Sequence, residues 1–166
     1  MTAKAPNHLS SSARRVQEAL ERLGMYLQVV ELPASTRTAQ EAAQAIGCTV
    51  GQIAKSLLFK TRDAYRPILV IASGTNRVNE EWLGSLIEER IDKADADFVR
   101  QRTGFAIGGV PPVGHLESIE TFIDRDLLAY PEIWAAAGTP HAVFKLTGDD
   151  LLAATGGRVI SVIGAK

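Results

Sequence analysis

Two glycine-rich loops and one lysine are the parts of this sequence best suited to chemistry. The first loop, TGFAIGGVPPVGH at 103–115, holds four glycines and two prolines and no formal charge. Glycine lets backbone N–H groups approach a ligand because no side chain stands in the way. Amides of Gly108 and Gly109, stiffened by Pro111 and Pro112, can therefore bind an oxygen-bearing group. A stiff connector that fills a gap in the core is the alternative interpretation.

The second loop, AAAGTPH at 135–141, lies between two expected strands. The first loop matches no common phosphate-binding motif. The first is not followed by Gly-Lys-Ser/Thr, and its glycines do not have the GxGxxG spacing. Together with a lysine, the two loops can enclose one small pocket.

Lys55 is the lysine in question, at the start of the β-forming run KSLLFKT. In a strand, alternate side chains share a face, so Lys55 lies beside Leu57 and Phe59. Burying an ammonium is costly unless it meets an anion or a polarised oxygen. Lys55 therefore either binds a ligand oxygen in a pocket or lies along the surface with its head in water.

The other polar residues predict no metal site and no cofactor. His115 and His141 each adjoin one of the loops without an acidic neighbour, and two histidines do not make a metal site. Ser73 lacks the context of a nucleophile elbow. Acidic pairs such as Glu80–Glu81 fit solvated helix faces, so no protein nucleophile is predicted.

Residues 38–58 have the outline of a helix-turn-helix DNA reader, with a helix, a glycine turn and a short second helix. A recognition helix needs basic or amide side chains aimed at bases and phosphates. The second helix here offers only Gln52 and Lys55, and the next residues are strongly β-forming. Two helices that cover a sheet are therefore favoured over DNA reading.

Composition predicts one ordinary globular domain, because 46% of the 166 residues are hydrophobic and 22% are charged. A net charge of −1 gives no overall attraction to nucleic acid or anionic membranes. The single cysteine, Cys48, excludes an internal disulfide. No signal-peptide core and no 18-residue apolar run is present. We expect a cytoplasmic protein with a flexible N-terminus at 1–12 and one domain over 13–166.

Periodicity and capping residues predict the elements that position the loops. Helices are expected from a Ser11 or Ser12 cap to Leu23 and over 38–47, 79–90, 95–104 and 147–157. Strands are expected over 26–32, 55–61, 67–74, 118–124, 141–146 and 158–163, with a connector at 124–140. The order lacks strict βαβ alternation, so we expect an α/β fold with a mixed, curved sheet rather than a doubly wound one.

Taken together, these features resemble the prolyl-tRNA editing-domain (YbaK-like) family. That family includes free-standing trans-editing proteins and the insertion domain of bacterial prolyl-tRNA synthetase. The resemblance covers Val29 to Val162 and rests on TAQEAAQAIGCTVGQIAKSLLF, PILVIASG, TGFAIGGVPPVGH and the tail IDRDLL…IWAAAGTPHAVFKLTGDDLLAATG. STRTAQEAA and GGVPPVGH are most similar to the free-standing branch. The implied fold is a single-domain, barrel-like mixed sheet surrounded by helices, with a pocket on one side.

The resemblance also implies roles for single residues. Lys55 falls on the family's signature lysine and Gly108 on the loop glycine whose amide positions the aminoacyl group, so both are predicted to be catalytic. The predicted substrate-binding residues are Ser73, Gly109, Val110, Pro111, Pro112, Gly114, His115, Ala137, Gly138 and Thr139.

The implied reaction is hydrolysis of the ester that joins a wrong amino acid to tRNA, by attack of water or of the neighbouring ribose hydroxyl. The cysteine-specific branch carries a His-Asp pair after the first-strand glutamate and an acid at the position of Val143. Here Leu32 and Pro33 follow Glu31. We therefore expect a pocket for a small aliphatic amino acid, such as alanine or 2-aminobutyrate, on tRNA(Pro).

The implied partners are the acceptor end of a mischarged tRNA and prolyl-tRNA synthetase. A non-catalytic module that binds an aminoacyl-adenylate or a nucleotide is the alternative function.

Overall fold

In the computed structural model, which describes residues 8–164, strands and helices are interleaved along the chain. The strands are β1 (Val29–Glu31), β2 (Ile53–Thr61), β3 (Pro67–Ser73), β4 (Ile91–Lys93), β5 (Glu120–Asp124), β6 (Ile133–Ala136), β7 (Ala142–Leu146) and β8 (Arg158–Ile160). The helices are α1 (Ser11–Arg22), α2 (Ala39–Ile46), α3 (Glu80–Ile87), α4 (Ala96–Thr103) and α5 (Gly148–Thr155), with 3₁₀ turns η2 (Val50–Gln52) and η3 (Arg125–Ala129). Of the N-terminal stretch 1–12 expected to be flexible, residues 1–7 lie outside the described residues.

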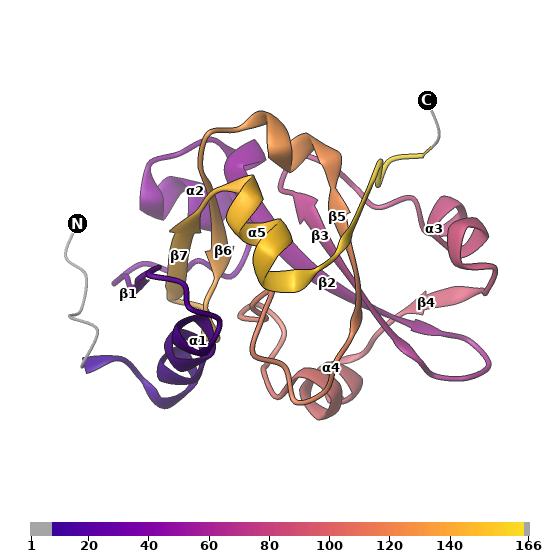
Figure 1. The fold of residues 1–166 in the computed structure, drawn as a ribbon, viewed down its shortest axis with the longest axis horizontal. Coiled ribbons are helices and arrows are strands. Elements are labelled where there is room, and N and C mark those ends of the chain that lie inside the picture. Colours follow the sequence, from indigo (N-terminus) through magenta and orange to yellow (C-terminus); the bar gives the residue numbers. More distant parts are fainter. Residues whose placement is uncertain (1–7, 165–166) are drawn as a thin grey trace.

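One twisted, mixed sheet runs through the centre of the molecule, with helices around it (Figure 1). Within residues 8–164 its strands follow the order β1-β7-β6-β2-β3-β5-β8, and β4 pairs with β2 from the side. β2 pairs antiparallel with β3 and β4 but parallel with β6. The expectation of an α/β fold with a mixed sheet surrounded by helices is confirmed.

Capping residues set where the helices begin and end. Thr38 and Glu41 form a capping box at the start of α2, and the helix ends at Gly47 in the left-handed conformation. Thr147 caps α5 in the same way, as predicted. The first helix differs slightly from expectation, because its N-cap is Ser10 rather than Ser11 or Ser12. No helix in the described part of the chain is long and apolar enough to span a membrane.

Several strand predictions were wrong in extent. The expected connector 124–140 contains η3 and the whole of β6, so residues 135 and 136 lie in a strand rather than in the second loop. β4 was also missed. Both strands are short, and they form because β2 and β7 offer them hydrogen-bonding edges, a non-local cause. The helix-turn-helix alternative fails, because η2 is a single turn that leads directly into β2.

The two faces of the sheet bury separate apolar clusters. Leu58 and Ile71 point to one face, where residues of α1, α4 and α5 pack. Phe59 and Val70 point to the other face, which α3 covers. α2 packs on the same second face at the opposite end of β2, against Ile53. The middle of β2 on this second face therefore lies between two covering helices.

β2 has an edge that is only partly paired. Along one side, β3 pairs with Ala54–Lys60. Along the other side, β6 pairs with Ile53 and Ala54 only, and β4 with Phe59–Thr61 only. Within the described residues, no strand pairs with this second edge over Lys55–Leu58. We call this stretch the β2 gap.

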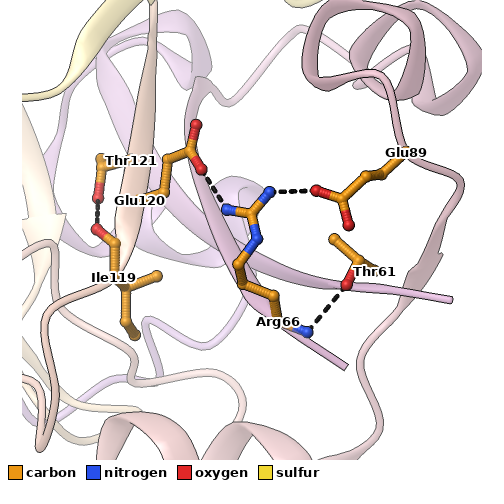
Figure 2. A network of polar contacts seen from close by, with 6 residues as sticks. All are labelled: Thr61, Arg66, Glu89, Ile119, Glu120 and Thr121. Carbon is orange, nitrogen blue, oxygen red and sulfur yellow. Dashed lines mark hydrogen bonds and ion pairs between the residues drawn. The ribbon is translucent and has the colours of Figure 1, made fainter. Parts of the chain in front are cut away.

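Near the turn between β2 and β3, Arg66 joins three segments (Figure 2). Its guanidinium contacts the carboxylates of Glu89, just after α3, and Glu120, at the start of β5, and its backbone N–H donates to Thr61 Oγ1 at 2.9 Å. The three charged side chains are 34–46% exposed, so solvent screens their attraction. Such surface pairs contribute about 0–1 kcal/mol each. The network orients the hairpin more than it stabilises the fold.

Candidate functional site

A pocket of about 510 Å³ opens beside the β2 gap. Its walls come from the start of α2 and the residues before it, from β2, from the residues leading into α3, from the first glycine loop and from β6. A volume of this size is typical of small-molecule sites. Apolar side chains such as Ile53, Val110 and Val143 make up much of the lining, and cationic side chains stand among them.

Lys55 lies in this pocket, between α2 and α3 on the second face of the sheet. Its Nζ donates one long hydrogen bond, 3.4 Å, to the Gly74 carbonyl oxygen. Burial lowers the pKa of Lys55; the negative charge of Asp124 opposes this effect, and Arg77 adds to it. An ammonium has three donors. Because the described residues provide one acceptor, the other donors are available to an oxygen of a ligand.

A buried carboxylate holds the turn that carries the acceptor of Lys55. Asp124 is fully buried at the end of β5. Its Oδ2 accepts hydrogen bonds from the Ser73 N–H and from Asn76 Nδ2, both at 2.9 Å. These bonds fix the residues on either side of Gly74. Asp124 is therefore a positioning residue for Lys55, by hydrogen bonding and by charge.

Replacing Asp124 with asparagine is expected to destabilise the protein by about 1.5–3 kcal/mol, the usual contribution of hydrogen bonds to a charged group. An amide retains one acceptor oxygen but turns an NH₂ group toward existing donors. Urea unfolding measures the loss. Asp149→Asn, at an exposed position of α5, serves as the control and should stay within about 0.5 kcal/mol of the unmodified protein. Equal stability of the two variants would contradict the positioning role.

The first glycine loop reaches the pocket through Ile107, Gly108 and Val110. Gly108 has φ of +93°, which only glycine adopts easily, and an added Cβ would lie 2.7 Å from Cγ of Arg37. Gly109 has a different environment. Its N–H donates to the Ala106 carbonyl at 3.1 Å, and its carbonyl accepts from the Gly138 N–H at 2.8 Å. Gly109 therefore joins the two loops, and it does not line the pocket.

The rest of the first loop forms a support behind this wall. Pro111 and Pro112 are buried, and Gly114 is exposed outside the pocket. His115 Nε2 lies 2.7 Å from the Pro111 carbonyl oxygen. Burial lowers the pKa of His115, although this hydrogen bond opposes the effect. A neutral imidazole that donates to Pro111 stiffens the loop from outside the pocket.

The second loop also lies behind the pocket wall. Ala137 is fully buried, and Gly138, at φ of +97°, packs so closely that a Cβ would lie 2.7 Å from the Ser12 carbonyl oxygen. Thr139 Oγ1 accepts from the His141 N–H at 3.1 Å. Ala135 and Ala136, which β6 contributes, do line the pocket.

Ser73 lies behind the pocket too. Its hydroxyl donates to the Gly51 carbonyl at 2.7 Å and is buried. Of the residues predicted from the sequence, the structure therefore brings Lys55, Gly108 and Val110 together at the pocket surface. The other predicted residues lie behind or outside it.

With this geometry in place, comparison with known proteins is informative. Residues 33–154 match the family model of the aminoacyl-tRNA editing domain, most of the chain. The chain belongs to the aminoacyl-tRNA editing-domain family. The resemblance inferred from the two loops and Lys55 is confirmed.

Relatives of this editing domain occur alone and within larger enzymes. The uncharacterised protein YwhH of Bacillus subtilis (strain 168) is 28% identical over 123 residues, which are 74% of this chain and 78% of YwhH. The proline–tRNA ligase of Bacillus licheniformis is 35% identical over 113 residues, 68% of this chain. The match spans only 19% of that ligase, so the likeness concerns one of its segments.

Solved structures show the same editing-domain fold. A crystal structure described as that of a candidate trans-editing enzyme for prolyl-tRNA synthetase is 52% identical, with a TM-score of 0.89. The alignment covers 95% of this chain and 99% of that one. The hypothetical protein APE2540 is 29% identical with a TM-score of 0.82, over 89% of this chain and 98% of the other.

Sequence reasoning missed several residues that line the pocket of this editing domain. Arg37 and Arg77 bring exposed cationic side chains to its rim. Trp134 lines it from the unpredicted strand β6. Thr36 and Ser56 also line it, and each has a buried hydroxyl oxygen without a hydrogen-bond partner among the described residues. Of these residues, only the arginines could have been suspected from the sequence, because arginines in loops close to a candidate site lysine suggest anion binding.

Proposed function

We propose that this editing domain is a trans-editing hydrolase that deacylates mischarged tRNA. The proposed substrate is tRNA(Pro) carrying a small amino acid such as alanine or 2-aminobutyrate. The observation that carries the proposal is the partly buried Lys55 ammonium with one protein acceptor, facing a pocket that the Gly108 loop closes. Family membership supports the editing role.

The proposed roles are assigned to residues that line the pocket. Lys55 anchors a phosphate or ribose oxygen of the terminal nucleotide, because a partly buried ammonium gains most from an anionic or polarised oxygen. The Gly108 N–H binds the aminoacyl carbonyl oxygen and stabilises the negative charge that develops there. In the reaction, the bond between the acyl carbon and the ribose oxygen breaks and the oxygen of water enters the new carboxylate. One proton of the water goes to the ribose oxygen and the other to solvent.

The pocket walls support the proposed choice of amino acid. Val143 and Ala136 present small apolar side chains to the pocket. The resemblance to the prolyl-tRNA editing-domain family implies that Val143 falls where the cysteine-specific branch has an acid. Such a wall favours an aliphatic side chain over a polar one. One methylene distinguishes substrates by only about 10–200-fold, which is why a synthetase benefits from a second, hydrolytic selection.

The proposed partners are the acceptor end of tRNA and prolyl-tRNA synthetase, with the protein acting in the cytoplasm. Arg37 and Arg77 at the pocket rim supply the local positive charge that a chain of net charge −1 otherwise lacks. tRNA binding is therefore expected to be modest and confined to the acceptor end.

A deacylation panel tests the proposal. tRNA(Pro) charged in turn with alanine, 2-aminobutyrate, cysteine and proline is incubated with the purified protein, and loss of each ester is compared with its spontaneous hydrolysis. We expect acceleration for alanine and 2-aminobutyrate and little for cysteine or proline. Absence of acceleration for every ester, combined with tight binding of an aminoacyl-adenylate analogue, would instead identify the non-catalytic binding module.

A further inference from the structure

Ser56 presents main-chain hydrogen-bonding groups to the β2 gap. Along β2, odd-numbered residues turn their backbone groups toward β3, since the Ile53 carbonyl accepts from the Gly74 N–H at 2.8 Å. Even-numbered residues turn theirs to the opposite edge, where the Leu58 carbonyl accepts from the Ala94 N–H at 3.2 Å. By this alternation, the N–H and C=O of Ser56 face the gap. Among the described residues, no strand partner meets them there.

The side chain of Ser56 adds a third unpaired group. Its Oγ is buried and has no hydrogen-bond partner in the described part of the chain. It shares a strand face with Ala54 and Leu58, which belong to the apolar core, and Ser56 lines the pocket. A buried hydroxyl without a partner is costly, and most such groups in native proteins are satisfied. The C=O of Ser56 therefore lies unused at the gap, and Oγ lies unused just behind it, buried from solvent.

An aminoacyl ester offers the complementary chemistry. Its α-amino group donates hydrogen bonds whether or not it is protonated, and it lies one carbon away from the ester carbonyl. We propose that Ser56 recognises the α-amino group of the aminoacyl moiety, with its C=O at the β2 gap as the first acceptor. Its Oγ, which water does not reach in the free protein, is the second acceptor once the amine is bound. This inference rests on the proposed function, since it names the part of the substrate that the same pocket reads. In this role Ser56 is a specificity residue, which accepts any small α-amino acid but rejects an acyl group without the amine.

Binding of two stable adenosine analogues tests the proposal without requiring turnover. One probe is 3′-deoxy-3′-(L-alanylamino)adenosine, and the other is its propanoylamino counterpart, which lacks only the α-amino group. We expect the unmodified protein to bind the alanyl probe about 10-fold more tightly, because a site built around a polar group rejects ligands that leave it unpaired. Equal dissociation constants for the two probes, measured by calorimetry, would overturn the proposal.

Ser56→Ala separates the side chain from the rest of the pocket. Removing an unsatisfied hydroxyl should leave the melting temperature unchanged or raised, so the variant should fold. We expect its preference for the alanyl probe to fall to about 3-fold or less. Ser85→Ala, on α3 and outside the pocket, is the matched control and should keep the full preference. A full preference in Ser56→Ala would overturn the role of Oγ.

A kinetic arm distinguishes this proposal from the proposed function. With alanyl-tRNA(Pro), Ser56→Ala should lower kcat/KM by about 3- to 10-fold relative to Ser85→Ala. A clear alanyl preference in binding without any deacylation by the unmodified protein would refute the hydrolase and support recognition by Ser56. Deacylation by the unmodified protein, combined with equal binding of the two probes, would support the hydrolase and refute recognition of the α-amino group by Ser56.

Discussion

Replacement of Lys55 with alanine is expected to lower kcat/KM for deacylation of alanyl-tRNA(Pro) by about 100-fold or more, the usual effect of removing one preorganised stabilising group. Lys55 reaches the pocket with a single 3.4 Å hydrogen bond to the protein, so its remaining donors are free to hold the substrate. Single-turnover deacylation, corrected for spontaneous hydrolysis of the ester, measures the effect.

Lys60→Ala is the matched control for this substitution. Lys60 belongs to the same strand but does not line the pocket, and its ammonium lies over the rings of Tyr65 and Phe98. The Lys60→Ala variant should have a kcat/KM for deacylation within about 3-fold of the unmodified protein, because the substitution removes a charge from the chain but not from the site. A similar loss for Lys55→Ala and Lys60→Ala would indicate a general effect of net charge on tRNA binding.

The protonation of Lys55 also makes the stability of the fold depend on pH. Burial lowers its pKa, so the ammonium loses its proton at a lower pH than an exposed lysine does. Below the lowered pKa, the folded state bears the full cost of a partly buried charge, and this cost declines as pH rises from that pKa toward the ordinary lysine pKa of the unfolded chain. Lys55→Met, which keeps the length of the side chain, should therefore be at least as stable as the unmodified protein at neutral pH while losing activity.

Gly108→Ala is expected to lower kcat/KM by about 10- to 100-fold. A side chain at φ of +93° costs about 1–2 kcal/mol in backbone strain. The added Cβ would also lie 2.7 Å from Cγ of Arg37, at the pocket wall. Either the loop or Arg37 must move, and the Gly108 amide then leaves its position. Deacylation kinetics and the dissociation constant of the alanyl probe check this result.

Gly24→Ala provides the same backbone strain without the contact. Gly24 has φ of +75°, follows α1 and has nothing within 4 Å of an added Cβ. Both variants should lose similar stability in urea unfolding, and only Gly108→Ala should lose activity. If Gly108→Ala deacylates as fast as Gly24→Ala, the Gly108 loop does not position the substrate.

The parts of the site that the sequence predicted are those with local causes. Strand alternation placed Lys55 beside Leu57 and Phe59, and the capping residue Thr147 marked the start of α5. The adjacent glycines 108 and 109 indicated a loop whose backbone amides can bind a ligand. Each of these inferences needs only neighbours within a few residues, where propensity and periodicity act.

The remaining features depend on contacts between distant segments. Gly109 differs from Gly108 because Gly138 hydrogen-bonds to it, a contact between segments that are far apart in the sequence. β6 forms on the edges of β2 and β7 rather than from a strong pattern of its own. Ser56 became a candidate only once β4 and β6 were seen to stop short of it, which no local pattern predicts.

The β2 gap also bears on whether a second chain could add a strand to this sheet. An unpaired strand edge is a template on which another chain can add a strand, and long exposed edges promote aggregation. Here the open stretch is confined to Lys55–Leu58, with β6 at one end and β4 at the other. An incoming strand would have to displace one of them before it could form a ladder. The gap is therefore long enough for a small ligand but too short for a full strand of a second polypeptide.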